Sequence, residues 1–266
     1  MHQNERNELA LEFANIASQA GRLIMESRNS DVKANFKSDG SPVTAADLQA
    51  EKLIRARLSE LIPGVAIIAE ESFEDSYATA PERFLLVDPL DGTREFVSGS
   101  DEFTVNIALI ADGEPVVGTI FAPALGHLYL AGATAFRADI QPGEALQQLA
   151  ATDIINTTAI PGAGMRAIGS RSHMDVETQR WLRRLPVAEL RSAGSSLKFC
   201  LIARGDADVY PRMAPTMEWD TAAGHAILTA AGGCVMSLNG EPLRYGKTDR
   251  GFKNAGFVAW GRKPLH

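Results

Sequence analysis

Two stretches near the start of the chain have apolar residues three or four positions apart, which places them on one face of a helix. In residues 9–27 and 44–61 these positions are Leu9, Phe13, Ile16, Ala20, Leu23 and Ile24, then Leu48, Leu53, Ile54, Leu58 and Leu61. The spacing predicts two amphipathic helices at the beginning of the chain.

Short apolar runs bounded by glycine, proline and polar residues come next, and such runs are typical of strands. The pattern predicts strands over residues 65–69, 84–87, 103–111, 115–122 and 127–131. Between two of them, Ala111-Asp112-Gly113-Glu114 has the composition of a hairpin turn. Because a hairpin joins antiparallel neighbours, we expect a sheet that is largely antiparallel.

The second half of the chain alternates between the two periods. It predicts strands over residues 165–169, 187–191, 207–210 and 234–237, and helices over 176–185, 195–203 and 219–231. This alternation indicates a second layer of helices and strands. Periodicity alone therefore predicts a mixed α/β protein.

Composition limits the classes of function. A chain of 266 residues that is 45% hydrophobic can bury a substantial core, as one large domain or two small ones. Its net charge of −7 disfavours a general nucleic-acid surface. Without an apolar signal core or a run of membrane-spanning length, we expect a cytoplasmic protein; peripheral association with the inner membrane stays open. Cys200 and Cys234 have the apolar context of free thiols.

The most informative segment is Asp88-Pro89-Leu90-Asp91-Gly92-Thr93, which follows the apolar run 84–87. Pro89 disfavours simple continuation of the strand, and Gly92 permits a tight turn that lets both carboxylates face one point. Oxygen ligands suit a hard cation, above all Mg2+, and two such ions about 4 Å apart would clamp a phosphoryl group. If a helix begins at Gly92 and Thr93, their N–H groups add an anion site.

Two more acids stand at the ends of predicted elements. A single D-x-x-D-G sequence is usually a surface turn. However, Glu70 ends the apolar run 65–69, and Asp220 opens a helical segment. With Asp88 and Asp91 these make four acids, which we expect to converge where neighbouring elements pack.

These segments resemble the inositol monophosphatase superfamily, in which Asp-Pro-(Ile/Leu)-Asp-Gly-Thr follows a Glu-Glu pair and precedes a distal Trp-Asp. Within it, the chain resembles the 3'(2'),5'-bisphosphate nucleotidases of the CysQ type from about residue 8 to 260. The segments that carry this closer resemblance are Gly40-Ser41-Pro42-Val43-Thr44-Ala45-Ala46-Asp47, Arg94-Glu95-Phe96-Val97, Glu102-Phe103-Thr104-Val105-Asn106-Ile107-Ala108-Leu109-Ile110 and Trp219-Asp220-Thr221-Ala222-Ala223-Gly224-His225.

The resemblance implies a layered α-β-α-β-α sandwich with its metal site between two halves. We expect residues 1–137 to form an α+β part with most metal ligands. Residues 138–266 would form an α/β part that contributes Asp220 and the substrate contacts. The two parts would act as one catalytic unit.

The same resemblance implies two or three Mg2+ ions per site. Glu70, Asp88 and the backbone carbonyl of Leu90 would bind the first ion. Asp88, Asp91 and Asp220 would bind the second. Because clustered carboxylates repel one another, the cations should also order the site.

The family pattern assigns the activation of water to Asp47 and Thr93. Glu71 would support the metal ligands without binding the metal itself. An aspartate that accepts a proton through a hydroxyl is a reasonable relay for attack on phosphorus. Asp47 also suits the first turn of a helix, where the dipole favours an acid.

Substrate choice depends most on Arg212. Inositol monophosphatases have a glutamate at the matching position, where it accepts hydrogen bonds from sugar hydroxyls. A guanidinium cannot accept such bonds and instead suits a second phosphate. The remaining expected substrate contacts are Gly92, Thr93, Ser170, Arg171, His173, Gly194, Ser195 and Lys198.

The implied substrate is adenosine 3',5'-bisphosphate, hydrolysed to AMP and phosphate, with lithium sensitivity and a link to sulfate assimilation. Its partner would be a small phosphate ester, not nucleic acid or an integral membrane, and the enzyme would be a monomer or homodimer. Three alternatives remain at this point: an inositol or histidinol monophosphatase, a fructose bisphosphatase, and a catalytically silent metal-binding module.

Overall fold

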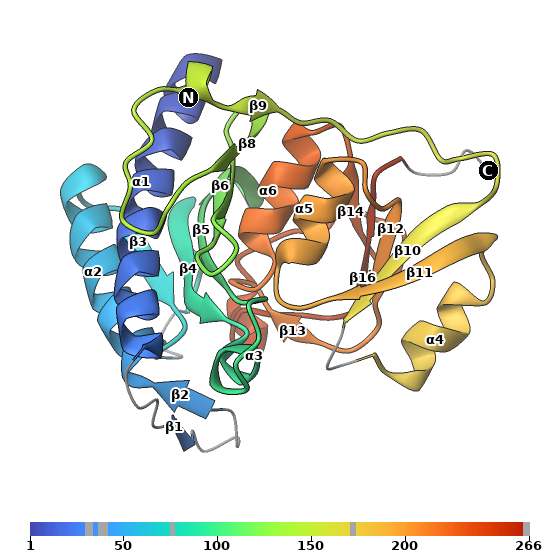
Figure 1. The fold of residues 1–266 in the computed structure, drawn as a ribbon, viewed down its shortest axis with the longest axis horizontal. Coiled ribbons are helices and arrows are strands. Elements are labelled where there is room, and N and C mark those ends of the chain that lie inside the picture. The colour runs from blue at the N-terminus through green and yellow to red at the C-terminus, as the bar shows by residue number, and fades with distance from the viewer. Residues whose placement is uncertain (30–33, 37–41, 75–77, 171–173, 263–266) are drawn as a thin grey trace.

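This computed structural model describes residues 1–29, 34–36, 42–74, 78–170 and 174–262. Across these residues the chain forms five layers, helix, sheet, helix, sheet and helix (Figure 1). The outer helical layer near the N-terminus consists of α1 (Gln3–Arg28) and α2 (Ala45–Leu61). The layered α-β-α-β-α prediction is confirmed.

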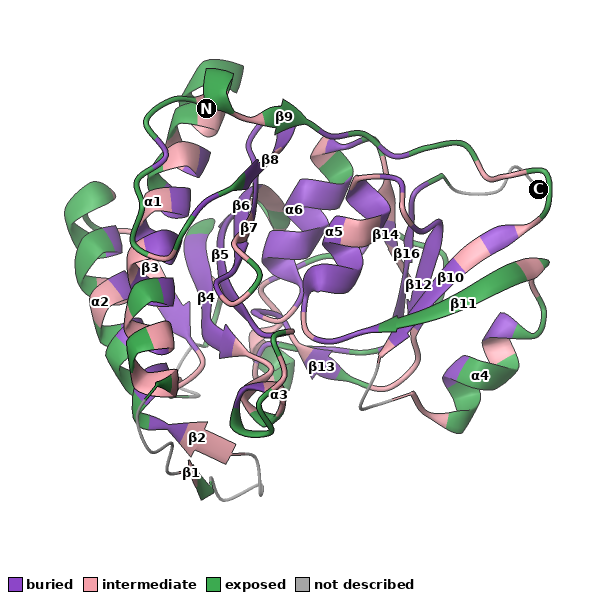
Figure 2. Cartoon of the chain, in the orientation of Figure 1, coloured by how far each residue is buried: buried purple, intermediate pink, exposed green. Residues whose placement is uncertain are grey.

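The larger sheet has seven strands in sequence order, antiparallel except for the parallel pair β3 and β4. Its side chains alternate between two cores: Leu85 and Val87 face α1 and α2, whereas Phe84 and Leu86 face the central helices. Both faces are therefore buried, as Figure 2 shows. The strands are β3 (Ala66–Ala69), β4 (Arg83–Asp91), β5 (Thr104–Ala111), β6 (Glu114–Ala122), β7 (His127–Ala131), β8 (Ala135–Asp139) and β9 (Asp153–Ile154).

The smaller sheet is mixed. Strand β10 pairs parallel with β11 and β12, whereas β16 pairs antiparallel with β12 and β14. Helix α4 (Val176–Leu182) covers its outer face, where Leu182 packs with Met165, Val209 and Trp260. The strands, in spatial order, are β11 (Val187–Ala193), β10 (Met165–Ser170), β12 (Val209–Arg212), β16 (Phe257–Trp260) and β14 (Cys234–Ser237).

Helices α5 (Leu197–Ala203) and α6 (Ala222–Ala230) lie between the two sheets. The close approach of α6 to the larger sheet requires a glycine: a Cβ atom at Gly118 of β6 would lie 2.6 Å from the carbonyl oxygen of Ala223. On the opposite face, a Cβ atom at Gly132 would lie 2.4 Å from the backbone of Arg6 in α1. Glycines thus let helices pack tightly on both faces.

Several short elements join these layers. Helix α3 follows β4 after one residue, Gly92 (Figure 1). Strand β13, which precedes α6 along the chain, pairs antiparallel with β15. The short elements are β1 (Ala34–Phe36), β2 (Pro42–Thr44), α3 (Thr93–Val97), η1 (Leu149–Ala151), β13 (Thr216–Met217), η2 (Thr248–Arg250) and β15 (Lys253–Asn254). None of the helices in the described part of the chain is long and apolar enough to span a membrane.

Three details differ from the sequence-based expectation. Strand β4 does not stop before Pro89 but continues to Asp91, with an irregular register between Asp88 and Asp91 that accommodates the proline. Helix α6 begins at Ala222, because Glu218 accepts N–H bonds in the preceding turn. The strands that the sequence did not predict are β1, β2, β8, β9, β13, β15 and β16. The boundary between residues 137 and 138 stays a prediction.

Candidate metal and phosphate site

Three carboxylates meet at the end of the parallel strand pair. Ala69 of β3 and Val87 of β4 form the last pair of these two strands, so the next residues, Glu70 and Asp88, lie side by side at the end of the pair. The Glu70 N–H donates to the Val87 carbonyl at 3.1 Å. Asp220 reaches them from the turn before α6, and one oxygen from each of Glu70, Asp88 and Asp220 lies within 4.8 Å of the others.

The electrostatics of this group favour a cation. Burial, followed by the charges of Glu70, Asp91 and Asp220, raises the pKa of Asp88 well above its usual value. Burial and the neighbouring carboxylates raise the pKa of Asp220 to about 7. A divalent cation would remove this repulsion, and an all-oxygen donor set suits Mg2+. The residues present therefore fit the metal that the sequence predicts.

Asp91 lines the same pocket and interacts with the cation of Lys198. Burial raises the pKa of Asp91, while Lys198 and the hydrogen bonds from Ser195 and Ser196 oppose that rise. Leu90 lies between the two aspartates; its N–H donates to Asp88 Oδ1 at 3.0 Å, and its carbonyl accepts from Thr93 at 3.1 Å.

Asp47 and Thr93 are joined as the sequence predicts for a proton relay. The Thr93 hydroxyl lies 3.1 Å from Asp47 Oδ1. The other oxygen, Asp47 Oδ2, accepts from the Thr44 N–H at 2.8 Å and from its hydroxyl at 2.6 Å, which forms the capping box of α2. Burial raises the pKa of Asp47 despite these hydrogen bonds. Asp47 therefore has both the helix-capping contact and the contact with Thr93.

Glu71 does not line the pocket. Its N–H donates to Glu51 Oε2 at 2.7 Å, which connects it to α2.

Gly92 lines the pocket, has a φ of 93° and precedes α3, so that Thr93 is the first residue of that helix. The glycine conformation explains how the chain turns from β4 into α3.

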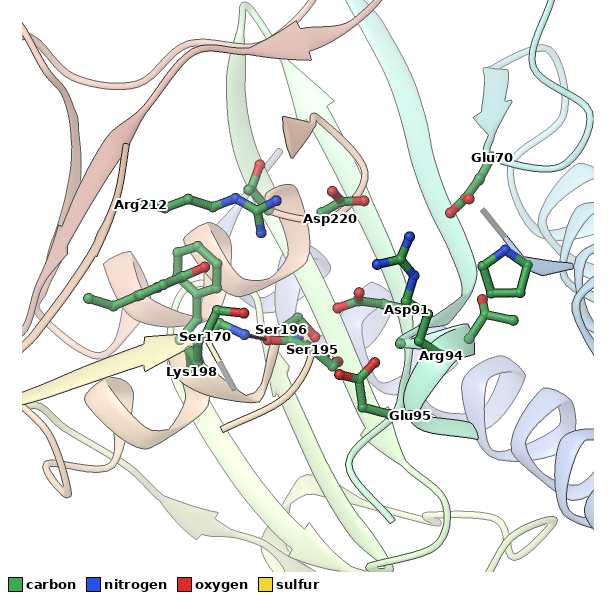
Figure 3. Close-up of a pocket in the computed structure, with 16 residues that line it drawn as sticks. Glu70, Asp91, Arg94, Glu95, Ser170, Ser195, Ser196, Lys198, Arg212 and Asp220 are labelled. Carbon is green, nitrogen blue, oxygen red and sulfur yellow. Dashed lines mark hydrogen bonds between the residues drawn. The ribbon is translucent and has the colours of Figure 1, made fainter. Parts of the chain in front are cut away.

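The pocket has a volume of about 250 Å3. Figure 3 shows Glu70, Asp91 and Asp220 facing Lys198 and Arg212 across it. The sequence-predicted residues that line it are Glu70, Asp91, Gly92, Thr93, Ser170, Ser195, Lys198, Arg212 and Asp220. The lining residues that were not among the expected site residues are Pro42, Arg94, Glu95, Ser196, Phe199, Tyr210 and Thr221.

Lys198 is only 3% exposed, yet it lines the pocket. Its ammonium group donates to the carbonyls of Ala193, at 3.3 Å, and Ser195, and it lies 5.3 Å from the centre of the Tyr210 ring. Burial lowers the pKa of Lys198 to about 8, although Asp91 opposes that effect. A bound anion would stabilise its charged form.

A polar network fixes the loop before α5. The Gly194 N–H donates to Glu102 at 2.6 Å, and Ser195 adopts a positive φ of 52°. The Ser196 hydroxyl donates to Asn106 at 2.7 Å and lies 2.8 Å from Thr104. The sequence predicted an anion or ribose contact for Gly194-Ser195-Ser196 but gave no role to Glu102, Thr104 or Asn106, since about ninety positions separate the two sides of the network. Two predicted contacts, Arg171 and His173, lie outside the described residues.

Comparisons with known proteins agree with this geometry. The inositol monophosphatase family matches residues 5–259. The 3'(2'),5'-bisphosphate nucleotidase CysQ of Escherichia coli K12 is 40% identical over 248 residues, which cover 91% of this chain and 95% of the relative. The protein of the same name from Haemophilus influenzae is 30% identical, with 88% and 86% covered.

A solved structure is similar over nearly the whole chain. The crystal structure of CysQ from Bacteroides thetaiotaomicron, a bacterial member of the inositol monophosphatase family, has a TM-score of 0.82 and 37% identity. The match covers 96% of this chain and 98% of that one. An inositol monophosphatase from Thermotoga maritima has a TM-score of 0.73 at 24% identity, which shows a shared fold.

Proposed function

The chain belongs to the inositol monophosphatase family, and we propose that within it the chain is a metal-dependent 3'(2'),5'-bisphosphate nucleotidase. It hydrolyses the 3'-phosphate of adenosine 3',5'-bisphosphate to give AMP and phosphate. The curated relatives of that name, up to 40% identical over almost their whole length, support this assignment over a sugar monophosphatase.

The observation that carries the proposal is the division of charge across the pocket. Glu70, Asp91 and Asp220 lie toward one side of the pocket, with Arg94 beside Asp91, and the cations Lys198 and Arg212 lie toward the other side (Figure 3). A substrate with two phosphates suits this arrangement, because one phosphate can lie at the acidic, metal-binding wall while the other contacts the cations. A polyol with a single phosphate would leave the cations without a second anion.

We assign the metal sites to the residues expected from the sequence. Glu70, Asp88 and the Leu90 carbonyl would hold one Mg2+ ion, and Asp88, Asp91 and Asp220 would hold another. Bound Mg2+ supplies Lewis acidity to the phosphate oxygens and lowers the pKa of water at the site. The repulsion that raises the pKa of Asp88 and Asp220 supports this set.

Thr93 and Asp47 would then handle the proton of the attacking water. The Thr93 hydroxyl accepts that proton as its own passes to Asp47 Oδ1, which lies 3.1 Å away. Because Thr44 donates twice to Asp47 Oδ2, Oδ1 stays directed at Thr93. Glu71 supports this arrangement through the backbone contact to α2.

The phosphate that is not cleaved would bind Arg212 and Lys198. Arg212 ends strand β12, and a guanidinium matches two phosphate oxygens at once. Ser170 and Ser195 line the same part of the pocket, and Gly194 precedes Ser195 in the loop that its N–H fixes to Glu102. Gly92 would offer its backbone to the phosphate that is cleaved.

Some wider properties follow from the family resemblance and are part of the proposal. We place the enzyme in the cytoplasm as a monomer or homodimer, inhibited by lithium. Residues 1–137 and 138–266 would act as one catalytic unit.

A phosphate-release assay tests the function directly. The enzyme with Mg2+ should give its highest kcat/KM on adenosine 3',5'-bisphosphate, above inositol 1-phosphate, histidinol phosphate and fructose 1,6-bisphosphate. A higher kcat/KM on any of these other esters would contradict the nucleotidase assignment. Release that persists after chelation would contradict the metal site.

A further inference from the structure

A buried ion pair lies two residues from Asp220. The side chain of Glu218 is fully buried, and its Oε1 accepts from the Lys247 ammonium group at 3.1 Å. Glu218 also accepts backbone N–H bonds from Gly246, at 2.7 Å, and Lys247, at 3.1 Å. The buried carboxylate of Glu218 therefore has one charge-assisted donor and two backbone donors.

The pair is part of a closed ring of hydrogen bonds. Lys247 donates to the Asn254 side-chain oxygen at 2.9 Å, and the Asn254 amide donates to the Thr221 hydroxyl at 2.9 Å. Thr221 donates in turn to the Glu218 carbonyl at 3.1 Å. Glu218 and Thr221 are both members of this ring, and Trp219 and Asp220 lie between them in the sequence.

The Asp220 carboxylate is attached to the same segment. Its Oδ2 accepts from the Thr216 hydroxyl and, at 3.1 Å, from the Met217 N–H. Both donors belong to β13, and Thr216 pairs with Asn254 of β15. The Glu218 N–H also donates to the Phe252 carbonyl at 2.8 Å. These contacts connect the turn that bears Asp220 to residues 246–254.

A row of aromatic rings connects residues 246–254 to the other acids. Phe252 lies 6.0 Å from Phe84, ring centre to ring centre, and Phe84 is on β4, the strand with Asp88. Phe73, three residues after Glu70, lies 5.3 Å from Trp219 and 5.8 Å from Phe252. Phe252 therefore packs against the segment that follows Glu70 and against the strand that bears Asp88.

We propose that the Glu218–Lys247 pair positions Asp220 against Glu70 and Asp88 and thereby sets the affinity of the site for its divalent cation. This inference rests on the proposed metal-dependent function. Loss of one partner would leave a buried charge uncompensated and loosen the turn, which would displace a ligand without removing it. Outer contacts of this kind change metal affinity about 10- to 100-fold.

The test is a calorimetric titration of Mg2+ into the wild type and into Glu218→Gln, which keeps the shape and removes the charge. The matched control is Asp208→Asn. Asp208 is also buried in an ion pair, with Arg166 at 2.7 Å, but it precedes β12 at the end opposite Arg212. Glu218→Gln should raise the Mg2+ Kd about 10- to 100-fold, whereas Asp208→Asn should lower Tm and leave Kd unchanged.

A second variant keeps the test decisive if Glu218→Gln folds poorly. Lys247 is 24% exposed, and in Lys247→Gln the Glu218 carboxylate keeps its backbone donors from residues 246 and 247, so this variant should fold. It should also raise the Kd, while Lys247→Arg retains the charge and should stay close to the wild type. In Glu218→Gln, activity should return at high Mg2+ concentration, which general instability would not produce.

Three outcomes are decisive, and they distinguish the positioning role from the proposed function. If the wild type binds Mg2+ and both Glu218→Gln and Lys247→Gln bind it equally well, the positioning role is wrong and the metal site stands. An equal loss of affinity in Asp208→Asn would also overturn the positioning role. If the single variant Asp220→Asn binds Mg2+ as tightly as the wild type, the metal assignment itself is wrong.

Discussion

The Thr93 hydroxyl has two acceptors within reach, Asp47 Oδ1 and the Leu90 carbonyl, each 3.1 Å away. If it relays a proton, Thr93→Ala should lower kcat about 100-fold or more and change KM little, because the relay acts chiefly in the transition state. Steady-state kinetics at saturating Mg2+ would measure this. Thr93→Ser keeps the hydroxyl and should retain most activity; an unaltered kcat in Thr93→Ala would remove Thr93 from the mechanism.

Arg212 is the residue on which substrate choice depends most. If it contacts the phosphate that is not cleaved, Arg212→Ala should lose about 1.5 to 3 kcal/mol, or roughly 10- to 150-fold in kcat/KM, on adenosine 3',5'-bisphosphate. Adenosine 3'-monophosphate lacks that phosphate, so its kcat/KM should barely change. Equal losses on both substrates would mean that Arg212 supports the fold or the metal site instead.

At the scale of the element, Gly118 decides how closely α6 approaches the larger sheet. A Cβ atom there would meet the backbone of Ala223, which cannot move aside without shifting α6. Gly118→Ala should therefore destabilise the protein by about 1 to 3 kcal/mol, as overpacking does in other cores. Urea denaturation measures the loss.

Gly162 provides the matched control for that substitution. A Cβ atom at Gly162 meets nothing within 4 Å, so Gly162→Ala should change stability by less than about 0.5 kcal/mol. If the two variants had similar urea midpoints, the close packing of α6 on β6 would be contradicted.

The elements that the sequence predicted well are those with a clear period or a complete turn signature. Helices α1 and α2 follow their apolar spacing, and the turn at Asp112 and Gly113 has positive φ at both positions, 53° and 74°, as a type I' hairpin requires. Short strands such as β9 and β13 have two residues each and no period to detect. They are fixed by the neighbours with which they pair.

The residues of the site also differ in how far a local sequence pattern could predict them. The convergence of Glu70, Asp88 and Asp220 was predictable, because acids at element ends form a recognisable motif. The contact of Glu102 with Gly194 joins residues 92 positions apart, so it depends on tertiary packing that a local pattern does not encode. The continuation of β4 through Pro89 also depends on its partner β5, which accommodates the irregular register.

For the whole molecule, the acidic group couples metal binding to stability. A cation that binds only the folded state at about 100 times its Kd adds about 2.7 kcal/mol. For a chain of this size, saturating Mg2+ should then raise Tm by about 5 to 10 °C over the chelated protein. Differential scanning calorimetry would show the rise. Asp220→Asn should reduce it, and an unchanged Tm in the wild type would contradict a metal site in the folded protein.

The most direct measurement of the central claim identifies the product of adenosine 3',5'-bisphosphate by 31P NMR, with Mg2+ and with chelator. We expect AMP that retains its 5'-phosphate, together with inorganic phosphate in equal amount, only when Mg2+ is present. Asp91→Asn should remain folded and form neither product, since it removes one anionic ligand and keeps the shape. Release of the 5'-phosphate, turnover without metal, or full activity in Asp91→Asn would contradict the account.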